Sequence, residues 1–470
     1  MNHSCALLLA IVLSGPALAA DTWDAPYAAN PILPGYYADP SLVQHDGKYY
    51  LYATLDRWGG RTLGCWESPD FKQWTYRELN WPTKEACTSP TSIGSMVWAP
   101  SVIRAPGGKF LMYVSVGSEV WVGSADHPLG PWTDAHGGTP LIPGNYRPGY
   151  HMIDAEVFVD DDGSLFLYWG SGWDWKNGRC FAVKLTPDGA AFAGEPVDVT
   201  PGNYFEGPFM LKHGGRYYLT YSQGVTISDT YQVHYAVGDS PFGPFTEATN
   251  SPILVTDHAR HVVSPGHHTL FTREGRTYML YHRHSVPYDK DKIGRQTCVD
   301  EVHFTADGLI EKLTPTHTGP ALARDRDTGR LAAAALASSE IAPLYGAARG
   351  LDDNHATRWA PAADARGGWL QLDLGGTQNI GRVAVRFEYA WKPYRFALEA
   401  SADGETWTTL ADHRATSFTG SPFTLTLTPA AAARYLRLVF PADAKPEEMS
   451  VWEFAAYAPA PPPLGDSPGR

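Results

Sequence analysis

An internal repeat constrains the fold of this chain more than any other feature. Five segments open with glycine and continue as an aromatic and aliphatic run of the kind that forms a β-strand; they are residues 47–52, 108–113, 163–168, 215–220 and 275–280. Their glycines are 61, 55, 52 and 60 residues apart, and a shorter apolar strand and a turn precede each one. Each unit therefore begins with a hairpin, and periods of this length are typical of propeller blades of four strands. We predict a five-bladed β-propeller over residues 21–320.

Composition agrees with an all-β protein of more than one domain. The chain has 470 residues, more than one packed core usually serves. Hydrophobic residues make up 43% and charged residues 19%, which excludes a disordered chain, while 46 Gly, 38 Pro and 13% aromatic residues argue against a helix bundle. The net charge of -13 gives no sign of a nucleic-acid partner.

The first 20 residues have the pattern of a secretory signal peptide. An apolar run over residues 6–13 is followed by small residues at 17–20, and the run is too short to span a membrane. We therefore predict that residues 1–20 are removed and that the protein is secreted or periplasmic. The cysteines that remain are Cys65, Cys87, Cys180 and Cys298. The sequence allows two states for these cysteines: disulfides, as expected in an oxidising compartment, or buried free thiols.

Acidic residues stand at the head of several units. Counting back eight or nine places from each hairpin glycine gives Asp39, Ala99, Asp154, Glu206 and His267. The first strand of each propeller blade lines the central channel, so these positions are expected to face one another. Acids also begin strands because they suit turns, but Glu206 stands in an apolar context that this explanation does not cover. We predict that the three carboxylates and the imidazole converge on one site.

Carboxylates that converge on one site are suited to general acid and base catalysis of glycosidic bond hydrolysis. Hydrophobic neighbours and a nearby carboxylate would keep Glu206 protonated, which makes it the candidate general acid. Asp39 lies in a more polar segment and is the candidate general base. Asp154 is then expected to orient Glu206 and raise its pKa.

The residues at these positions make the chain similar to glycoside hydrolase family 43, whose members are five-bladed propellers. The motifs that carry the resemblance are residues 37–41, 98–101, 153–158, 206–208 and 266–268. The resemblance implies an inverting hydrolase with Asp39 as general base, Glu206 as general acid and Asp154 as pKa modulator. It also implies that Trp98 is a platform for the terminal sugar, ordinary blade packing being the alternative, and that Arg283 contacts the substrate.

His267 matches a position that, in many such relatives, holds a central calcium ion, partly through water. Calcium prefers oxygen ligands, so an imidazole is an unusual direct partner. The neighbouring His268 is an alternative inward-facing residue, and a hydrogen-bonded structural histidine is the alternative to a metal site. We expect no cofactor for the chemistry and calcium only as a structural ion.

The repeat stops near residue 320 and a different β pattern follows. Residues 351–359, 369–375, 380–385, 398–407, 433–438 and 451–453 resemble the discoidin, or factor 5/8 type C, module, which is a β-sandwich jelly roll. We place this domain at residues 321–457 and a disordered Pro-rich tail at 458–470. The resemblance implies a structural calcium held by Asp352, Thr357 and Glu453, although Asp353 stands where relatives commonly have glycine.

The predicted function is a secreted inverting glycosidase that removes terminal pentosyl units, such as α-L-arabinofuranose or β-xylose, from plant-type polysaccharides. A galactofuranosidase on the same fold is one alternative, and a non-catalytic carbohydrate-binding propeller is another. The expected partner is an oligo- or polysaccharide substrate, with no nucleic acid and no membrane span. The oligomeric state and the sugar bound by the second domain, if any, stay open.

Overall fold

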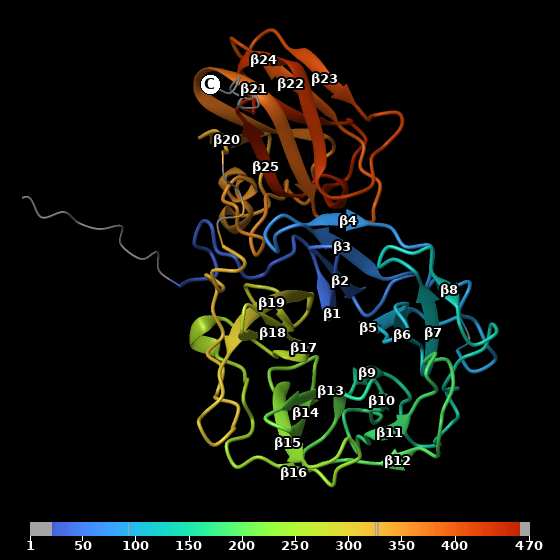
Figure 1. Ribbon diagram of the computed structural model, residues 1–470. Coiled ribbons are helices and arrows are strands. Elements are labelled where there is room, and N and C mark those ends of the chain that lie inside the picture. Colours follow the sequence, from blue (N-terminus) through green and yellow to red (C-terminus); the bar gives the residue numbers. More distant parts are fainter. Residues whose placement is uncertain (1–20, 93, 325, 327–328, 461–470) are drawn as a thin grey trace, which may run out of the picture.

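The computed structural model describes residues 21–460 except 93, 325, 327 and 328. The predicted signal peptide and residues 461–470 of the predicted tail lie outside the described residues. The described chain is nearly all β and forms a ring of small sheets with a second β domain beside it (Figure 1). None of its helices has the length and apolar character needed to cross a membrane.

The ring is a five-bladed propeller in which four blades have four described strands and the fifth has three. The innermost strands are β1 (Tyr37–His45), β5 (Val97–Arg104), β9 (Glu156–Val159), β13 (Glu206–His213) and β17 (Gly266–Arg273). The second strands are β2 (Lys48–Leu55), β6 (Phe110–Val116), β10 (Leu165–Trp169), β14 (Arg216–Gln223) and β18 (Arg276–His284). The third strands are β3 (Gly64–Ser68), β7 (Glu119–Ala125), β11 (Phe181–Lys184), β15 (Gln232–Gly238) and β19 (Arg295–Val302). The outer strands are β4 (Thr75–Arg77), β8 (Thr133–Asp134), β12 (Val197–Asp198) and β16 (Thr246–Glu247).

The repeated glycine has a simple structural cause. Each one lies in the turn between the first and second strand of a blade, with positive φ: Gly47 75°, Gly108 90°, Gly163 81°, Gly215 80° and Gly275 74°. Glycine adopts this conformation without the steric penalty that other residues pay. The aromatic run that follows becomes the buried second strand, and side chains such as Trp66, Trp121 and Trp169 fill the space between blades. The hairpin repeat read from the sequence therefore corresponds to the blade.

The second domain is a β-sandwich. Its strands are β20 (Ala334–Ala337), β21 (Gly368–Phe387), β22 (Ala397–Ser401), β23 (Thr408–Asp412), β24 (Phe423–Phe440) and β25 (Val451–Tyr457). The two long strands β21 and β24 pair antiparallel through two register shifts, with β22 on one half of the pair and β25 on the other. A core that includes Trp359, Phe387 and Leu438 fills the interior. The short 3-10 turns are η1 (His258–Arg260), η2 (Pro343–Tyr345), η3 (Ala347–Gly350) and η4 (Pro446–Glu448).

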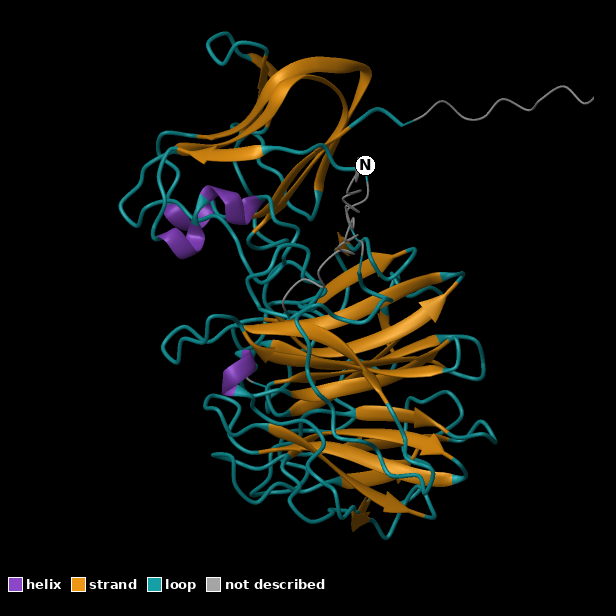
Figure 2. Cartoon of the chain, turned by 90° about the vertical axis from the view of Figure 1, so that its left-hand side faces the viewer, coloured by secondary structure: helices purple, strands orange, loops and turns teal. Residues whose placement is uncertain are grey.

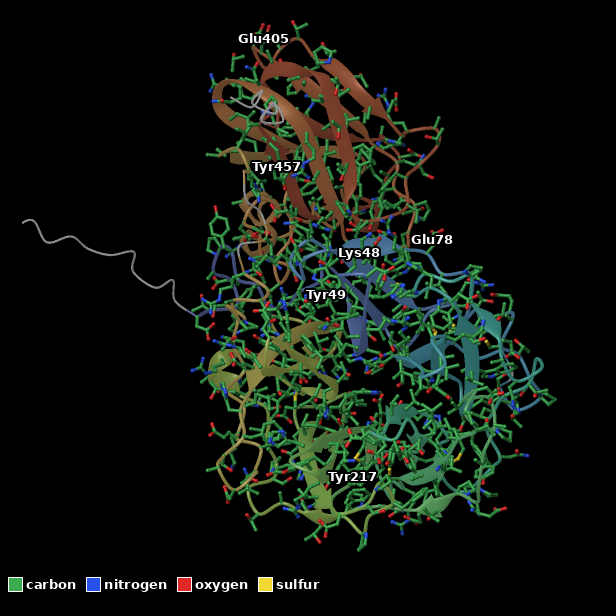
Figure 3. All side chains as sticks on the ribbon, viewed as in Figure 1. Lys48, Tyr49, Glu78, Tyr217, Glu405 and Tyr457 are labelled. Carbon is green, nitrogen blue, oxygen red and sulfur yellow. The ribbon has the colours of Figure 1, made fainter. Side chains whose placement is uncertain are left out.

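The sandwich packs against the first blade, beside β3 and β4 (Figures 1 and 2). The amide of Tyr76 donates to the carbonyl of Ser421 at 2.7 Å, and Arg386 donates to the carbonyl of Trp74 at 3.0 Å. In Figure 3, Glu78 lies near this junction, whereas Glu405 lies at the end of the sandwich remote from the propeller. The domains therefore meet on one side of the ring.

All the cysteines within the described part of the chain are buried free thiols: Cys65, Cys87, Cys180 and Cys298. Each lies in a hydrophobic core between blades. Of the two alternatives left open by the sequence, the structure therefore contains the free thiols.

Candidate active site

The structure brings the predicted acidic residues together at the centre of the propeller. Asp39, Asp154, Glu206 and His267 all line one cavity of about 400 Å³. The innermost strands β1, β13 and β17 carry Asp39, Glu206 and His267, and Asp154 lies two residues before β9 (Figure 1). Ala99 of blade two lines the same cavity, so all five predicted positions meet.

A β-bulge at the head of the innermost strands aims these side chains. The pairing with the second strand shifts register between Ala38 and Ser41, and equivalent shifts follow Trp98, Glu206 and Gly266. At the bulge the backbone adopts positive φ: Asp39 53°, Ala99 46°, Asp154 58°, Gly207 59° and His267 37°. Positive φ at non-glycine residues is uncommon and gathers at functional sites. Glu206 therefore lies one residue before the position that matches Asp39, which corrects our alignment of the repeat by one place.

The second strand of one blade forms a hydrogen bond with the bulge in the first strand of the following blade. A side-chain atom on the second strand accepts the N–H of the bulge residue in the following blade: Thr54 Oγ1 from Ala99 at 2.8 Å, Ser115 Oγ from Asp154 at 3.0 Å, Ser222 Oγ from His267 at 2.9 Å and His282 Nδ1 from Asp39 at 3.3 Å. These bonds satisfy buried amide groups that the bulge removes from the sheet. They fix the site to the rigid part of each blade rather than to loops.

Asp39 is buried, and four side chains lie close to its carboxylate. Thr54 Oγ1 donates to Oδ2 at 2.7 Å, and Arg295 Nη1 donates to Oδ1 at 3.0 Å. Nδ1 of His282 and Nδ1 of His267 lie 3.1 Å and 3.2 Å from the same Oδ1. The carboxylate of Asp39 therefore has little freedom to rotate.

Opposing effects act on the pKa of Asp39. Burial by itself raises this pKa, but the positive charge of Arg295, followed by the contributions of His267 and His282, outweighs burial and holds the pKa well below its usual range. Asp39 is therefore ionised at neutral pH. An ionised carboxylate fixed in one orientation is suited to accept a proton from water.

Glu206 has the opposite environment. Burial raises the pKa of Glu206 to about 7, although hydrogen bonds from Ser171 and Tyr231 to its carboxylate lower it, and the negative charge of Asp39 raises it. Ser171 Oγ donates to Oε2 at 2.9 Å, and Tyr231 Oη donates to Oε1 at 2.8 Å. A substantial fraction of Glu206 is therefore protonated near neutral pH, as a general acid requires.

The pKa of Asp154 is raised, as is that of Glu206. Burial, then repulsion by Glu206 and Asp39, raises the pKa of Asp154 well above its usual range. Oδ2 of Asp154 lies 3.6 Å from Nδ1 of His267. The cavity thus pairs one carboxylate held ionised with two whose protonated forms are favoured, and this separation suits acid and base hydrolysis of a glycosidic bond.

Aromatic side chains form the walls of the cavity. Trp98 lines it and is half-buried, with its indole N–H donating to the carbonyl of Gly117 at 3.1 Å. Trp58 lines it as well, and the guanidinium of Arg295 lies 4.7 Å from the centroid of that ring. Trp173, 51% exposed, stacks on His151 at the rim with the ring centroids 4.2 Å apart. These flat apolar faces are suited to packing against a sugar ring.

The prediction that Arg283 contacts the substrate is not supported by its position. Arg283 is fully buried, does not line the cavity, and donates to Nδ1 of His317 at 3.0 Å. The arginine of blade five that does line the cavity is Arg295, at the start of β19. Arg295 also pairs with Asp56, whose Oδ1 lies 2.8 Å from Nη2. Sequence reasoning missed Arg295, Trp58, Tyr231 and His282.

The predicted central ion does not fit the surroundings of His267. Nδ1 of this residue faces the carboxylates of Asp39 and Asp154, and Arg295 already supplies a positive charge to Asp39. Across the described ranges, no group of three or more His, Cys, Asp or Glu side chains is placed to hold a metal ion. The oxygen-rich shell that calcium requires is therefore not formed at this position.

The residues predicted to hold calcium in the sandwich do lie together, but guanidinium groups contact their oxygens. Thr357 Oγ1 donates to Asp352 Oδ2 at 2.8 Å, and the amide of Asp353 donates to Glu453 Oε2 at 2.8 Å. Nη2 of Arg330 lies 2.6 Å from the other oxygen of Glu453. Asp353 keeps the positive φ, 51°, that a glycine would adopt there. The three predicted residues therefore lie together where the loop meets β25.

Comparison with known proteins agrees with this arrangement. The family model described as glycosyl hydrolases family 43 matches residues 28–310, and that of the F5/8 type C domain matches residues 334–454. A β-D-galactofuranosidase of Aspergillus niger is 35% identical over 330 residues, which are 66% of this chain and 93% of that protein. An arabinoxylan arabinofuranohydrolase of Bacillus subtilis is 26% identical over 346 residues, 62% of this chain and 65% of that protein.

Solved structures give the same result over both domains. A structure described as a glycoside hydrolase superimposes with a TM-score of 0.77 at 28% identity, covering 92% of this chain and 99% of that one. The two predicted domains, the propeller and the discoidin-like sandwich, are therefore of the kinds that the motifs indicated. The chain is a glycoside hydrolase that belongs to family 43 and carries a C-terminal F5/8 type C domain.

Proposed function

We propose that this enzyme removes terminal β-D-galactofuranosyl residues with inversion at the anomeric carbon. The observation that carries the choice of sugar is the 35% identity to a β-D-galactofuranosidase over 93% of that protein's length. Relatives named for arabinose and xylose match at 25–27% identity. The pentosyl specificity that we favoured from the sequence therefore has weaker support than its galactofuranosyl alternative.

The cavity supports a hydrolysis in which water attacks in a single displacement. Asp39 takes a proton from the water molecule as the water oxygen bonds to the anomeric carbon. Glu206 gives its proton to the glycosidic oxygen as the bond from that oxygen to the anomeric carbon breaks. The low pKa of Asp39 and the pKa of about 7 for Glu206 support these two roles.

The wall residues account for recognition of a terminal furanose. Trp58 and Trp98 offer apolar faces to the ring, while Arg295 offers donors beside Asp39. Galactofuranose differs from arabinofuranose by one further hydroxymethyl carbon on its exocyclic arm. A cavity of about 400 Å³ that is walled by Trp173 and Ile227 gives this arm an apolar surface to contact.

The test compares 4-nitrophenyl β-D-galactofuranoside with 4-nitrophenyl α-L-arabinofuranoside and 4-nitrophenyl β-D-xylopyranoside. We expect the highest kcat/KM on the galactofuranoside, and NMR should detect α-D-galactofuranose as the product first released. The variant Asp39→Asn, which lacks the base needed with every substrate, serves as the control for contaminating activity. A higher kcat/KM on either pentoside would reject galactofuranose as the preferred sugar, and first release of the β anomer would reject inversion.

A further inference from the structure

A second and larger cavity lies between the two domains. Its volume is about 860 Å³, and both domains contribute to its lining. The side chains that matter below are Arg57 and Gln296 of the propeller and Arg358, Tyr389 and Trp391 of the sandwich. Nothing described so far uses this space, although it is large enough for several sugar units.

A buried polar atom in the lining lacks a hydrogen-bond partner among the described residues. Gln296 is fully buried; its Nε2 donates to the carbonyl of His355 at 3.3 Å, whereas its Oε1 has no partner. Arg358 has a side chain 16% exposed; its Nη2 lies 2.9 Å from Glu388 Oε1, and its guanidinium lies over the rings of Tyr345 and Trp452. Unpaired buried polar atoms are rare in proteins because they are costly. Oε1 of Gln296 is thus a buried acceptor in the wall of this cavity without a partner among the described residues.

The same lining carries aromatic faces. Tyr389 and Trp391 are half-buried with their ring centroids 5.2 Å apart and nearly perpendicular, at 70°. The ring of Tyr389 also lies 5.8 Å from that of Tyr36 between centroids, and the Lys392 ammonium lies 3.7 Å from the Tyr389 centroid. Aromatic faces combined with a few fixed donors and acceptors suit a ligand that has both apolar C–H surfaces and hydroxyl groups. The lining also contains both signs of charge, including Arg57 and Glu388, which favours a neutral ligand.

The interdomain cavity and the catalytic cavity share one wall. Along residues 57–59, Arg57 and Gly59 line the interdomain cavity, whereas Trp58 between them lines the catalytic cavity. The start of β19 repeats this alternation, because Arg295 lines the catalytic cavity and Gln296 the interdomain cavity. The two cavities are therefore separated only by these short segments of chain.

We infer that the interdomain cavity binds the neutral glycan chain on the leaving-group side of the bond that is cleaved. The inference rests on the proposed glycosidase activity and names where the rest of the substrate lies. The sandwich then forms part of the substrate-binding site and contributes to selection of polymeric over small substrates. Loss of contacts here affects binding of the long substrate but leaves the chemistry at Asp39 and Glu206 intact.

The test uses the full chain with Gln296→Met and Tyr389→Ala, and Trp407→Ala as the control. Glu405, two residues before Trp407 in the chain, lies at the end of the sandwich away from the propeller (Figure 3). Kinetics are measured on 4-nitrophenyl β-D-galactofuranoside and on a β-linked galactofuranose oligosaccharide. We expect KM for the oligosaccharide to rise at least fivefold in both cavity variants. KM and kcat for the aryl substrate should stay within twofold, with melting temperatures recorded to verify folding.

Two results would overturn the inference. An unchanged KM for the oligosaccharide in both cavity variants would show that the cavity does not hold the glycan, and an equal loss on both substrates would show that it serves only the fold. If wild type hydrolyses no galactofuranoside, the proposed function fails instead. The cavity variants are then compared on the aryl glycoside that wild type does cleave and on the corresponding oligosaccharide. Failure of the galactofuranosidase proposal is thereby distinguished from failure of the cavity inference.

Discussion

Arg295 at the start of β19 donates from Nη1 to Oδ1 of Asp39 in β1, at 3.0 Å. This bond joins the last blade of the propeller to the first, so closing the ring also places a positive charge beside the proposed base. Among the groups that lower the pKa of Asp39, Arg295 is the strongest. The proposed base therefore depends on a residue about 250 positions away in the sequence, and its environment exists only in the closed ring.

The first prediction concerns this pair. Replacing Arg295 with Gln removes the charge that lowers the pKa of Asp39, so the pKa rises and the ionised base is lost at a higher pH. We expect the acidic limb of the kcat/KM profile to move up by about one pH unit or more. Arg283→Gln is the control, because Arg283 is buried away from the cavity and pairs with His317. Arg283→Gln should lower the melting temperature and leave the acidic limb of the profile in place. If the acidic limb does not move in Arg295→Gln, Asp39 is not the base.

The second prediction concerns the hydroxyl of Tyr231. This hydroxyl donates to Glu206 Oε1 at 2.8 Å and stabilises the carboxylate form. Tyr231→Phe removes that donor, so the pKa of Glu206 rises above its value of about 7 and the alkaline limb of activity moves to higher pH. The control is Tyr235→Phe, since the Tyr235 hydroxyl donates to Asn250 instead. If the alkaline limb of Tyr231→Phe moves to lower pH or does not move, a group other than Glu206 determines that limb.

The third prediction concerns Thr54, whose hydroxyl makes two bonds. It donates to Asp39 Oδ2 at 2.7 Å and accepts the amide of Ala99 at 2.8 Å. Thr54→Val leaves both buried groups without this partner, so we expect a loss of about 1–3 kcal/mol in the free energy of unfolding and a lower kcat. Thr54→Ser keeps the hydroxyl and should restore most of both. Urea unfolding and steady-state kinetics measure the two effects, and equal stability of the three proteins would contradict this account.

The fourth prediction concerns calcium in the sandwich. Because Arg330 and the amide of Asp353 already contact Glu453, removal of divalent ions should not release the loop from β25. We expect the melting temperature to be the same in EDTA and in excess calcium. A fall in EDTA that calcium reverses would show that an oxygen cage forms at Asp352, Thr357 and Glu453 after all.

Much of the site could be predicted because it repeats with the blades. Asp39 and Asp154 stand at fixed distances from hairpin glycines, and the propeller geometry brings those positions to one channel. The one-place error at Glu206 arose because the bulge separates the acid from the residue of positive φ, Gly207. Counting residues from a turn does not reveal on which side of a bulge a side chain lies.

The choice between Arg283 and Arg295 could not be made from the sequence. Both lie in blade five, and β18 pairs with β19 so that Arg283 stands opposite Gln296 while Arg295 stands opposite His284. Side chains alternate faces along a strand, so a shift of one residue decides between a buried position and the cavity. Trp58 lies in an irregular loop, where no periodic pattern indicates the direction of its side chain. The interdomain cavity depends on how two separate domains pack, which neither repeat nor motif encodes.

The central claim is that protonated Glu206 supplies the proton that leaves with the departing glycan. The most direct test is the pH dependence of kcat/KM for wild type on an alkyl β-D-galactofuranoside, whose leaving group needs a proton, and for Glu206→Gln on 2,4-dinitrophenyl β-D-galactofuranoside, whose leaving group needs none. We predict an alkaline limb near pH 7 in wild type when the substrate is an alkyl galactofuranoside, and residual activity with no such limb in Glu206→Gln on the activated substrate. An alkaline limb that persists at the same pH in Glu206→Gln would contradict the claim.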